Sequence, residues 1–282
     1  MKTMFKGTVL FLLMNALLFG FMAGKANAQQ QEDEQPLPPT LKELQNIPKL
    51  NTIISGDFQK PQELRIEAMK EAAISYGARG GLARRTFEIR QELERRSDYL
   101  DRIFDFSHLL IPAPSGLLIE PPTISESEDS MIIQNNGTRA AVADLYINIG
   151  LNSRIVSGAR NWRQYLYRNF TEVAEPPDIL RPENSDERRM WKEWVSTGWQ
   201  QGIKQAEEIF EEDLNLLTAH YQGMVRYRKL LAKGMISTPF ALQEDRGITG
   251  GGSEMRVGDR EVQLTGLPQL KSGFDEWQPV SR

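Results

Sequence analysis

Two long stretches of the chain place apolar residues three and four positions apart, which is the spacing of an amphipathic helix. The first covers residues 61–106 and opens with Pro61, which suits a first helical turn. The second covers residues 185–234, with Ser185 as an N-cap candidate and Gly234 as a C-cap candidate. Its apolar stripe consists of Trp191, Trp194, Val195, Gly198, Gly202, Ile203, Phe210, Leu214, Leu217, Tyr221, Met224, Tyr227 and Leu231. The pattern predicts two long helical segments as the main part of the fold.

Glycines interrupt both predicted helices. Gly77, Gly80 and Gly81 fall within the first, and Gly198 and Gly202 within the second. Such glycines mark a bend, a break or a close contact between helices. An unbroken second helix would be roughly 75 Å long at 1.5 Å per residue, and ordinary helices are far shorter. A break near one of the last two glycines is therefore left open.

The region between the helices has the character of β-structure. Residues 117–119 form a short apolar run, and residues 140–149 alternate apolar and polar positions, as in a half-buried strand. Residues 154–156 are a candidate partner for the alternating strand, whereas the acidic residues 125–130 predict a solvated loop. We expect a small antiparallel sheet within residues 117–156.

Two further elements complete the predicted fold. Residues 162–170 read as a short aromatic helix, and residues 248–253 as a glycine-rich loop. Residues 255–257 and 261–264 flank Gly258-Asp259 and predict a C-terminal β-hairpin. The sequence thus predicts an α+β fold that is mainly helical, with long helices, a small antiparallel sheet and a C-terminal β-hairpin.

The N-terminus has the pattern of a cleavable signal peptide. Lys2 and Lys6 precede a run without charge over residues 7–24, and Ala26-Asn27-Ala28 has the form of a cleavage site. The alternative is a retained membrane anchor, which the cleavage motif and the polar interruptions of the run disfavour. We expect export across a bacterial inner membrane and cleavage after Ala28.

The chain after the expected cleavage site divides into a tether and one domain. Residues 29–43 are rich in Gln, Glu, Asp and Pro, a composition typical of a flexible tether. Residues 44–282 are interpreted as a single domain, and residues 41–54 as one short amphipathic segment broken at Pro48. No later stretch is apolar over a length that spans a bilayer, so the mature chain is expected to be soluble or peripheral to the membrane.

Charge and cysteine content exclude several functions. The formal net charge is −4, and removal of Lys2, Lys6 and Lys25 with the signal peptide makes it −7. A mildly acidic protein is a poor nucleic-acid binder, and the arginines of residues 84–96 alternate with glutamates, which indicates a mixed-charge helix face. The chain contains no cysteine, which excludes disulfides, thiolate catalysis and the acylated cysteine of a bacterial lipoprotein.

No constellation of residues predicts catalysis, cofactor binding or metal binding. His108 and His220 are the only histidines, and no nucleophile elbow or lysine-bearing phosphate loop occurs. The carboxylates at residues 207–208 and 211–213 are interpreted as a solvated helix face, because nothing apolar surrounds them to raise a pKa. The sequence predicts a protein that is not an enzyme and holds no metal or cofactor.

Aromatic residues are the remaining candidates for a functional surface. Trp162, Tyr165 and Trp199 are the predicted partner interface, because tryptophan and tyrosine are favoured at buried protein contacts. Packing within the core of the chain itself is the alternative for each of them.

Several stretches, taken in order, resemble the DotC family, known as TraI in conjugative plasmids of the IncI type. They are residues 77–83, Thr86 with residues 104–106, residues 161–166, 193–202, 205–212, 227–232 and 264–270. None of these stretches is a chemical signature, so the resemblance depends on their number and order across the chain from about Leu44. The family's cysteine for lipid attachment is missing here.

The resemblance implies a structural role rather than catalysis. It implies a subunit of the outer-membrane core complex of a type IVB secretion or conjugation system, in a multi-subunit ring with DotD-like lipoproteins and DotH-like subunits. The expected location is the periplasm, with peripheral outer-membrane association through these partners and no direct contact with nucleic acid. The alternatives are a periplasmic carboxylate-dependent hydrolase, suggested only by the acidic helix, and a solute-binding protein, which would need alternating strands and helices.

Overall fold

A computed structural model describes residues 37–48, 62–134, 136, 138–273, 275 and 277. The chain divides into Met1–Leu37 and a second unit, Pro38–Arg282, which contains every helix and strand described below. The predicted signal peptide and most of the predicted tether lie outside the described residues. The division into signal peptide, tether and a domain from residue 44 stays a prediction.

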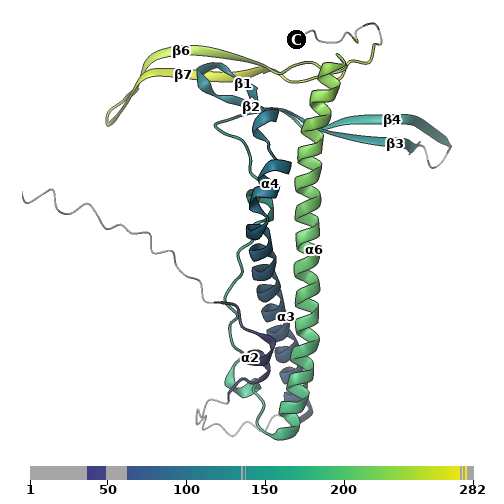
Figure 1. The fold of residues 1–282 in the computed structure, drawn as a ribbon, viewed down its shortest axis with the longest axis vertical. Helices are drawn as coiled ribbons and strands as arrows, with labels where there is room; N and C mark the ends of the chain where they lie inside the picture. Colours follow the sequence, from purple (N-terminus) through teal and green to yellow (C-terminus); the bar gives the residue numbers. More distant parts are fainter. Residues whose placement is uncertain are drawn as a thin grey trace, which may run out of the picture. The chain divides into compact units, whose positions relative to one another are not determined.

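The second unit consists of two long helices, three short ones and three small antiparallel sheets (Figure 1). The α-helices are α2 (Leu41–Gln45), α3 (Gln62–Arg95), α4 (Ser97–Ile103), α5 (Arg163–Leu166) and α6 (Ser185–Ala232). The strands are β1 (Ile111–Pro112), β2 (Leu118–Glu120), β3 (Thr123–Gln134), β4 (Arg139–Leu151), β5 (Arg154–Val156), β6 (Phe240–Gly251) and β7 (Glu254–Gly266). The predicted fold class, α+β with long helices and a C-terminal hairpin, is confirmed.

The two long helices run parallel to each other. Arg65 near the start of α3 pairs with Glu187 near the start of α6 at 2.6 Å, and Arg85 further along α3 pairs with Glu207 at 3.0 Å. Parallel neighbours cannot be joined by a tight turn, so residues 96–184 form a long connection from the end of α3 back to the start of α6. We call this connection the crossover; it contains α4, α5 and strands β1 to β5.

Glycines on both helices make the contact between α3 and α6 close. A methyl group added at Gly77 or Gly81 would overlap a carbonyl oxygen of α6, and one at Gly198 or Gly202 would overlap a carbonyl oxygen of α3. α6 is continuous through these glycines, so they mark a close helix contact and not a break. Its N-cap is Asn184, one residue before the predicted cap, whose side chain accepts the Glu187 N–H at 2.9 Å.

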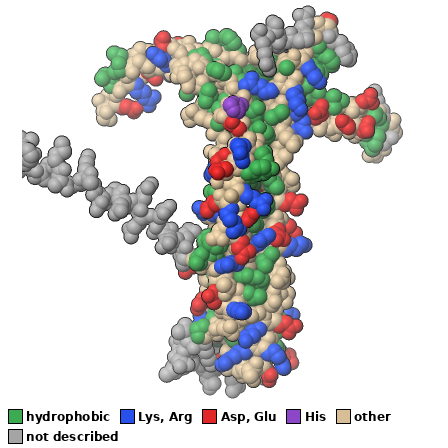
Figure 2. All heavy atoms as spheres, viewed as in Figure 1, with side chains coloured by type: hydrophobic (Ala, Val, Ile, Leu, Met, Phe, Trp, Pro, Cys, Tyr) green, Lys and Arg blue, Asp and Glu red, His purple; other side chains and the backbone are tan. Residues whose placement is uncertain are grey.

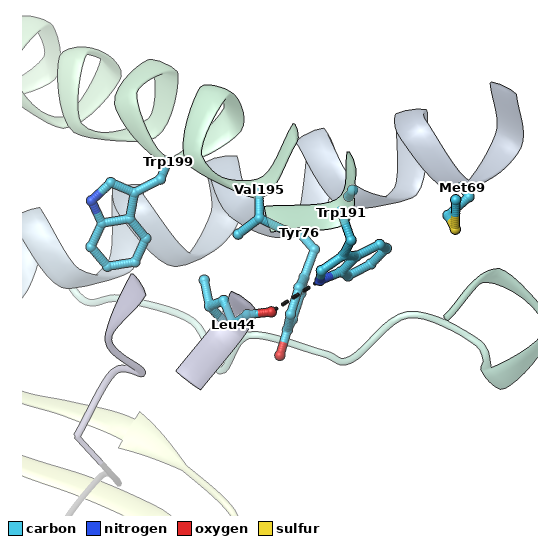
Figure 3. Close-up of a cluster of buried hydrophobic side chains, with 7 residues drawn as sticks. Leu44, Met69, Tyr76, Trp191, Val195 and Trp199 are labelled. Atoms are coloured by element: carbon cyan, nitrogen blue, oxygen red, sulfur yellow. Dashed lines mark hydrogen bonds between the residues drawn. The ribbon is translucent and has the colours of Figure 1, made fainter. Parts of the chain in front are cut away.

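Apolar side chains pack around this contact in a first core cluster. Figure 3 shows Tyr76 of α3 and Trp191, Val195 and Trp199 of α6 together with Leu44 of α2. The Trp191 indole N–H donates to the Leu44 carbonyl oxygen at 3.2 Å, which satisfies the one polar group of a fully buried ring. α2 is therefore fixed to both long helices. Two further clusters continue the core along α6. The second includes Phe106, Trp162 and Leu217, and the third includes Ile124 and Tyr227.

The strands of the crossover pair differently from the prediction. β5 pairs with β2 and not with the alternating strand β4, whose partner is β3. The acidic residues 125–130, predicted as a loop, lie within β3. Charged residues are tolerated there because most of this two-stranded ribbon is exposed on both faces, and the acidic side chains alternate with serines.

The C-terminal hairpin is longer than predicted and its turn lies elsewhere. β6 and β7 pair from Phe240↔Gly266 to Gly251↔Glu254, so the turn is at residues 252–253 and not at Gly258-Asp259. The predicted glycine-rich loop is mostly part of β6. Gly258 and Gly247 both have φ near +70° at a register shift in the ladder, which is the conformation of a β-bulge and explains glycine at these positions.

The predicted aromatic helix over residues 162–170 is also shorter, because α5 ends at Leu166. Beyond it the backbone is extended, and the Phe170 ring packs edge-on against Phe87 of α3 with centroids 5.7 Å apart. Tertiary contacts with the long helices thus replace the last helical turn.

The glycine contact predicts that a glycine-to-alanine replacement in a helix lowers the free energy of unfolding, which is opposite to the usual effect. Replacing an exposed helix glycine by alanine normally stabilises by about 1 kcal/mol. Gly202→Ala should instead destabilise by about 3 kcal/mol, because the methyl group overlaps the Ala78 carbonyl oxygen and the helices must separate. Urea unfolding of the purified protein measures this difference.

Gly158→Ala is the matched control, since an added methyl group there has nothing within 4 Å. Its free energy of unfolding should stay within about 0.5 kcal/mol of the parent protein. A stabilised Gly202→Ala variant would show that the helices are not in close contact.

Candidate functional site

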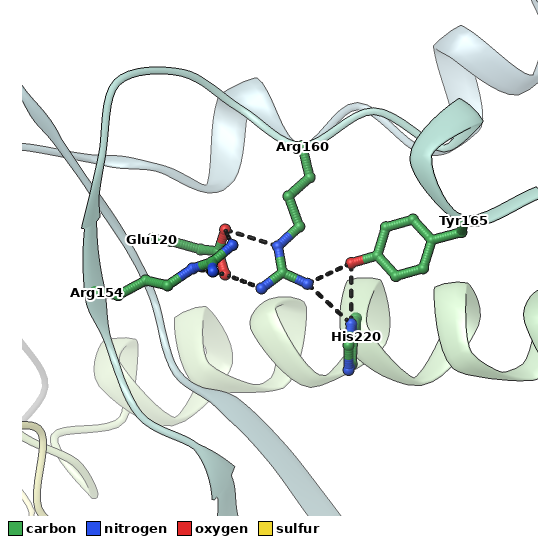
Figure 4. A network of polar contacts seen from close by, with 5 residues as sticks. All are labelled: Glu120, Arg154, Arg160, Tyr165 and His220. Carbon is green, nitrogen blue, oxygen red and sulfur yellow. Dashed lines mark hydrogen bonds and ion pairs between the residues drawn. The ribbon is translucent and has the colours of Figure 1, made fainter.

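A network of five polar side chains joins the crossover to the C-terminal half of α6. Figure 4 shows Glu120 at the end of β2, Arg154 on β5, Arg160 in the following loop, Tyr165 on α5 and His220 on α6. The sequence brings them together because β2 and β5 pair as Glu120↔Arg154, and the loop after β5 then turns back toward α6. The five residues come from four elements and one loop that are distant along the chain.

The carboxylate of Glu120 is the centre of this network. It is 4% exposed and accepts hydrogen bonds from Arg160 at 2.6 and 2.8 Å and from Arg154 at 3.1 Å to each oxygen. A buried carboxylate is tolerated only when it is paired and hydrogen-bonded. Two guanidinium groups meet this requirement, and both carboxylate oxygens are occupied by them.

Arg160 also connects the carboxylate to the long helix. Its Nη1 atom donates to the Tyr165 hydroxyl oxygen at 2.6 Å and lies 3.1 Å from Nδ1 of His220, and the Tyr165 hydroxyl lies 2.9 Å from the same nitrogen. Arginine is always a donor. His220 Nδ1 is therefore the acceptor, and the imidazole is neutral with its proton on Nε2.

Electrostatics in the network agree with this assignment. Burial and the positive charge of Arg160 lower the pKa of His220 below its usual value of 6.5, and burial raises the pKa of Tyr165 above 10.0. At neutral pH the imidazole of His220 and the phenol of Tyr165 are thus both neutral. Both oxygens of Glu120 and Nδ1 of His220 are occupied within the network, an arrangement typical of a structural connection.

A second buried ion pair lies about two turns further toward the start of α6. Asp213 is 7% exposed and accepts hydrogen bonds from Arg168 of the crossover at 2.7 and 2.6 Å. The interpretation of residues 211–213 as a solvated face is wrong for Asp213, because the crossover covers this side of α6. Among the acidic residues that suggested a hydrolase, Asp213 is held by a guanidinium group.

The three predicted interface residues serve the core and the polar network. Trp162 is fully buried in the second cluster, and its indole N–H donates to Asp101 at 2.6 Å. Trp199 is 8% exposed in the first cluster, and Tyr165 is half-buried in the polar network. Both tryptophans are occupied by packing within the chain itself. Their part in a partner interface stays a prediction.

Sequence reasoning missed Glu120, Arg154, Arg160 and Arg168 as important residues. Their spacing matches no motif, and each pairs with a residue that only the tertiary fold brings near. His220 was interpreted as structural, and its place in the network agrees with that interpretation. Among the described residues, no group of histidine and carboxylate side chains is arranged to hold a metal ion.

The surface of the long helices carries mixed charge (Figure 2). Arg84 pairs with Glu88 at 3.0 Å and Arg90 with Glu94 at 3.3 Å, each one turn apart on α3. The arginine-rich part of α3 is thus a mixed-charge face, as predicted. Over the described part of the chain, none of the helices combines the length and the apolar composition needed to cross a bilayer.

Comparison with known proteins agrees with the resemblance found in the residues. A sequence model of the TraI family, described as type IV secretory system, conjugal DNA-protein transfer, matches residues 63–279. This range runs from the first turn of α3 through β7, so the chain belongs to the TraI family of type IV secretory system components. Comparison with curated proteins found no match.

The central role of Arg160 predicts a large effect on stability. Arg160→Gln should lower the free energy of unfolding by about 3 kcal/mol, because Glu120 would keep its buried charge with one partner removed. Arg256→Gln is the control, since this exposed arginine pairs with exposed Glu254 and its replacement should cost less than about 1 kcal/mol. Equal losses in urea unfolding would contradict the assignment of Glu120 as a buried, charged centre.

His220 predicts a pH dependence of stability. Its pKa is lowered by folding, so the unfolded chain binds the proton more readily once the pH falls below about 6.5. The free energy of unfolding should therefore fall as the pH is lowered from 6.5 toward the folded-state pKa. His220→Asn keeps an acceptor near the position of Nδ1 and should remove this contribution. Identical pH profiles of stability for the variant and the parent protein would refute the role of His220.

Proposed function

We propose that this protein is a non-enzymatic structural subunit of the outer-membrane core complex of a type IVB secretion or conjugation system. It acts in the periplasm after cleavage of its signal peptide, within a multi-subunit ring that includes DotD-like lipoproteins and DotH-like subunits. Family membership supports a role in conjugal transfer, and the saturated polar network supports structure over catalysis. The proposed role in assembly depends on one observation.

That observation is the exposure of the two β-hairpins. The β3–β4 hairpin pairs Met131, 60% exposed, with Val142, 70% exposed, and the β6–β7 hairpin pairs Ile248 with Val257, 68% and 71% exposed. Both are two-stranded ribbons within the described chain, and apolar side chains from them reach the surface (Figure 2). An isolated two-stranded hairpin is marginally stable in water.

Such hairpins are suited to bind other subunits. Each strand of a two-stranded ribbon has an outer edge whose N–H and C=O groups can pair with a further strand. Between residues 140 and 150, strand β4 has one charged residue, Asp144. Proteins usually protect free strand edges with several charged residues. Strand addition from partner subunits would cover both the edges and the apolar side chains.

Attachment to the outer membrane then follows from these partners. The chain has no cysteine to carry a lipid, and the described residues contain no membrane-spanning helix. Docking to a lipid-anchored DotD-like protein and a DotH-like protein would supply the attachment. Genes for a relaxase and an origin of transfer beside this gene would indicate that the cargo is plasmid DNA and not effector protein.

Fractionation of cell envelopes tests this proposal. The protein expressed alone should be found in the soluble periplasmic fraction, beginning at Gln29, and it should move to the outer-membrane fraction when the whole gene cluster is present. Val142→Lys should abolish this movement without changing the free energy of unfolding by more than about 0.5 kcal/mol, because the side chain is exposed in the single chain.

Ile179→Lys is the matched control, because Ile179 is 51% exposed but lies outside both hairpins. It should move to the outer membrane like the parent protein. Outer-membrane association in the absence of every partner, or normal association of Val142→Lys, would contradict the proposal.

A further inference from the structure

A cavity of about 220 Å³ lies between the two long helices, beyond the end of their glycine contact. Residues 168–172 of the crossover also line it. The apolar lining includes Leu82, Ala83 and Ile89 of α3, Ala206 and Phe210 of α6, and Phe170 of the crossover. We call this cavity the interhelical slot.

The residues that line the slot are spread along the axes of both helices. Its lining extends from Arg79 to Ile89 on α3, which at 1.5 Å per residue corresponds to roughly 15 Å. A cavity of about 150 Å³ holds benzene, so by proportion this one holds roughly nine carbon atoms. An unbranched chain of that size can follow the lining residues along the helices.

The two ends of the slot differ in their polar groups. The Arg168–Asp213 pair lines one end, and its charges are satisfied by each other at 2.6 and 2.7 Å. At the other end, exposed Arg79 donates to the Ser75 carbonyl oxygen at 3.4 Å, and no carboxylate lies within ion-pair distance of it among the described residues. Exposed Glu172 also lines the slot. Arg79 can therefore contact an anionic head group while the apolar part is enclosed.

From this geometry we infer that the interhelical slot binds the apolar end of a single unbranched acyl chain. The acyl chain enters beside Arg79 and lies between α3 and α6 under the crossover, and its head group remains at the surface. This inference does not rest on the proposed assembly role, since it depends only on the lining of the cavity. A free fatty acid and a membrane phospholipid share the chemistry that the slot recognises.

Titration of the purified mature protein with decanoate tests the inference. Calorimetry should show saturable binding with one site, and 1-decanol should bind at least threefold more weakly because it lacks the charge that Arg79 contacts. Ala206→Leu and Ala83→Leu each place a larger side chain in the slot and should weaken decanoate binding at least tenfold. Ala219→Leu, at an exposed position of α6, is the control and should bind as the parent protein does.

Thermal unfolding shows whether the variants remain folded. If only one of Ala206→Leu and Ala83→Leu is folded, that variant alone tests the inference. Binding to phosphatidylglycerol vesicles that is lost in the same variants would identify the source as a membrane lipid, and binding of decanoate alone would identify a free fatty acid. The absence of saturable decanoate binding to the parent protein, or equal binding by both leucine variants and the parent, would overturn the inference.

Discussion

The close parallel contact between α3 and α6 is the interaction on which the rest of the structure depends. Four glycines, two on each helix at a spacing of four residues, allow the backbone of one helix to lie directly against carbonyl groups of the other. Each glycine reduces the stability of its own helix by up to about 1 kcal/mol relative to alanine. The packing of Tyr76, Trp191 and the neighbouring side chains offsets this loss, because the first core cluster forms only when the helices lie this close.

Arginine side chains provide the second level of organisation. The crossover lies over two helices that already face each other, and apolar side chains such as Phe106 and Trp162 pack part of it against α6. In addition, Arg168 binds the buried carboxylate of Asp213 on α6, Arg160 lies between Glu120 and His220, and Arg181, itself 5% exposed, donates to the Pro48 carbonyl oxygen at 2.9 Å. Guanidinium groups suit this role because each can bind several acceptors in fixed directions. The crossover is therefore held on α6 both by apolar packing and by the hydrogen bonds of its arginines.

The sequence predicted those features that depend on local pattern. The long helices follow from their apolar periodicity, and the resemblance to the DotC and TraI family is confirmed by the match over residues 63–279. Strand pairing was predicted less well, since Arg154 pairs with Glu120 across a sheet whose partners are far apart in sequence. The turn of the C-terminal hairpin was placed at Gly258-Asp259 because a bulge and a turn both favour glycine with positive φ. The functional weight of Trp162 and Trp199 was not predictable, because an aromatic residue serves a core and an interface by the same chemistry.

The parallel arrangement of the long helices determines the order in which the protein can fold. Arg65 and Glu187 are separated by 122 positions, so the contacts that define the core are among the most distant in the chain. Loops of this length are closed slowly, and proteins dominated by such contacts fold slowly. A chain that is synthesised from its N-terminus cannot complete the contact between the helices until nearly three quarters of it has been made. The nascent protein thus remains without its main core during most of its synthesis.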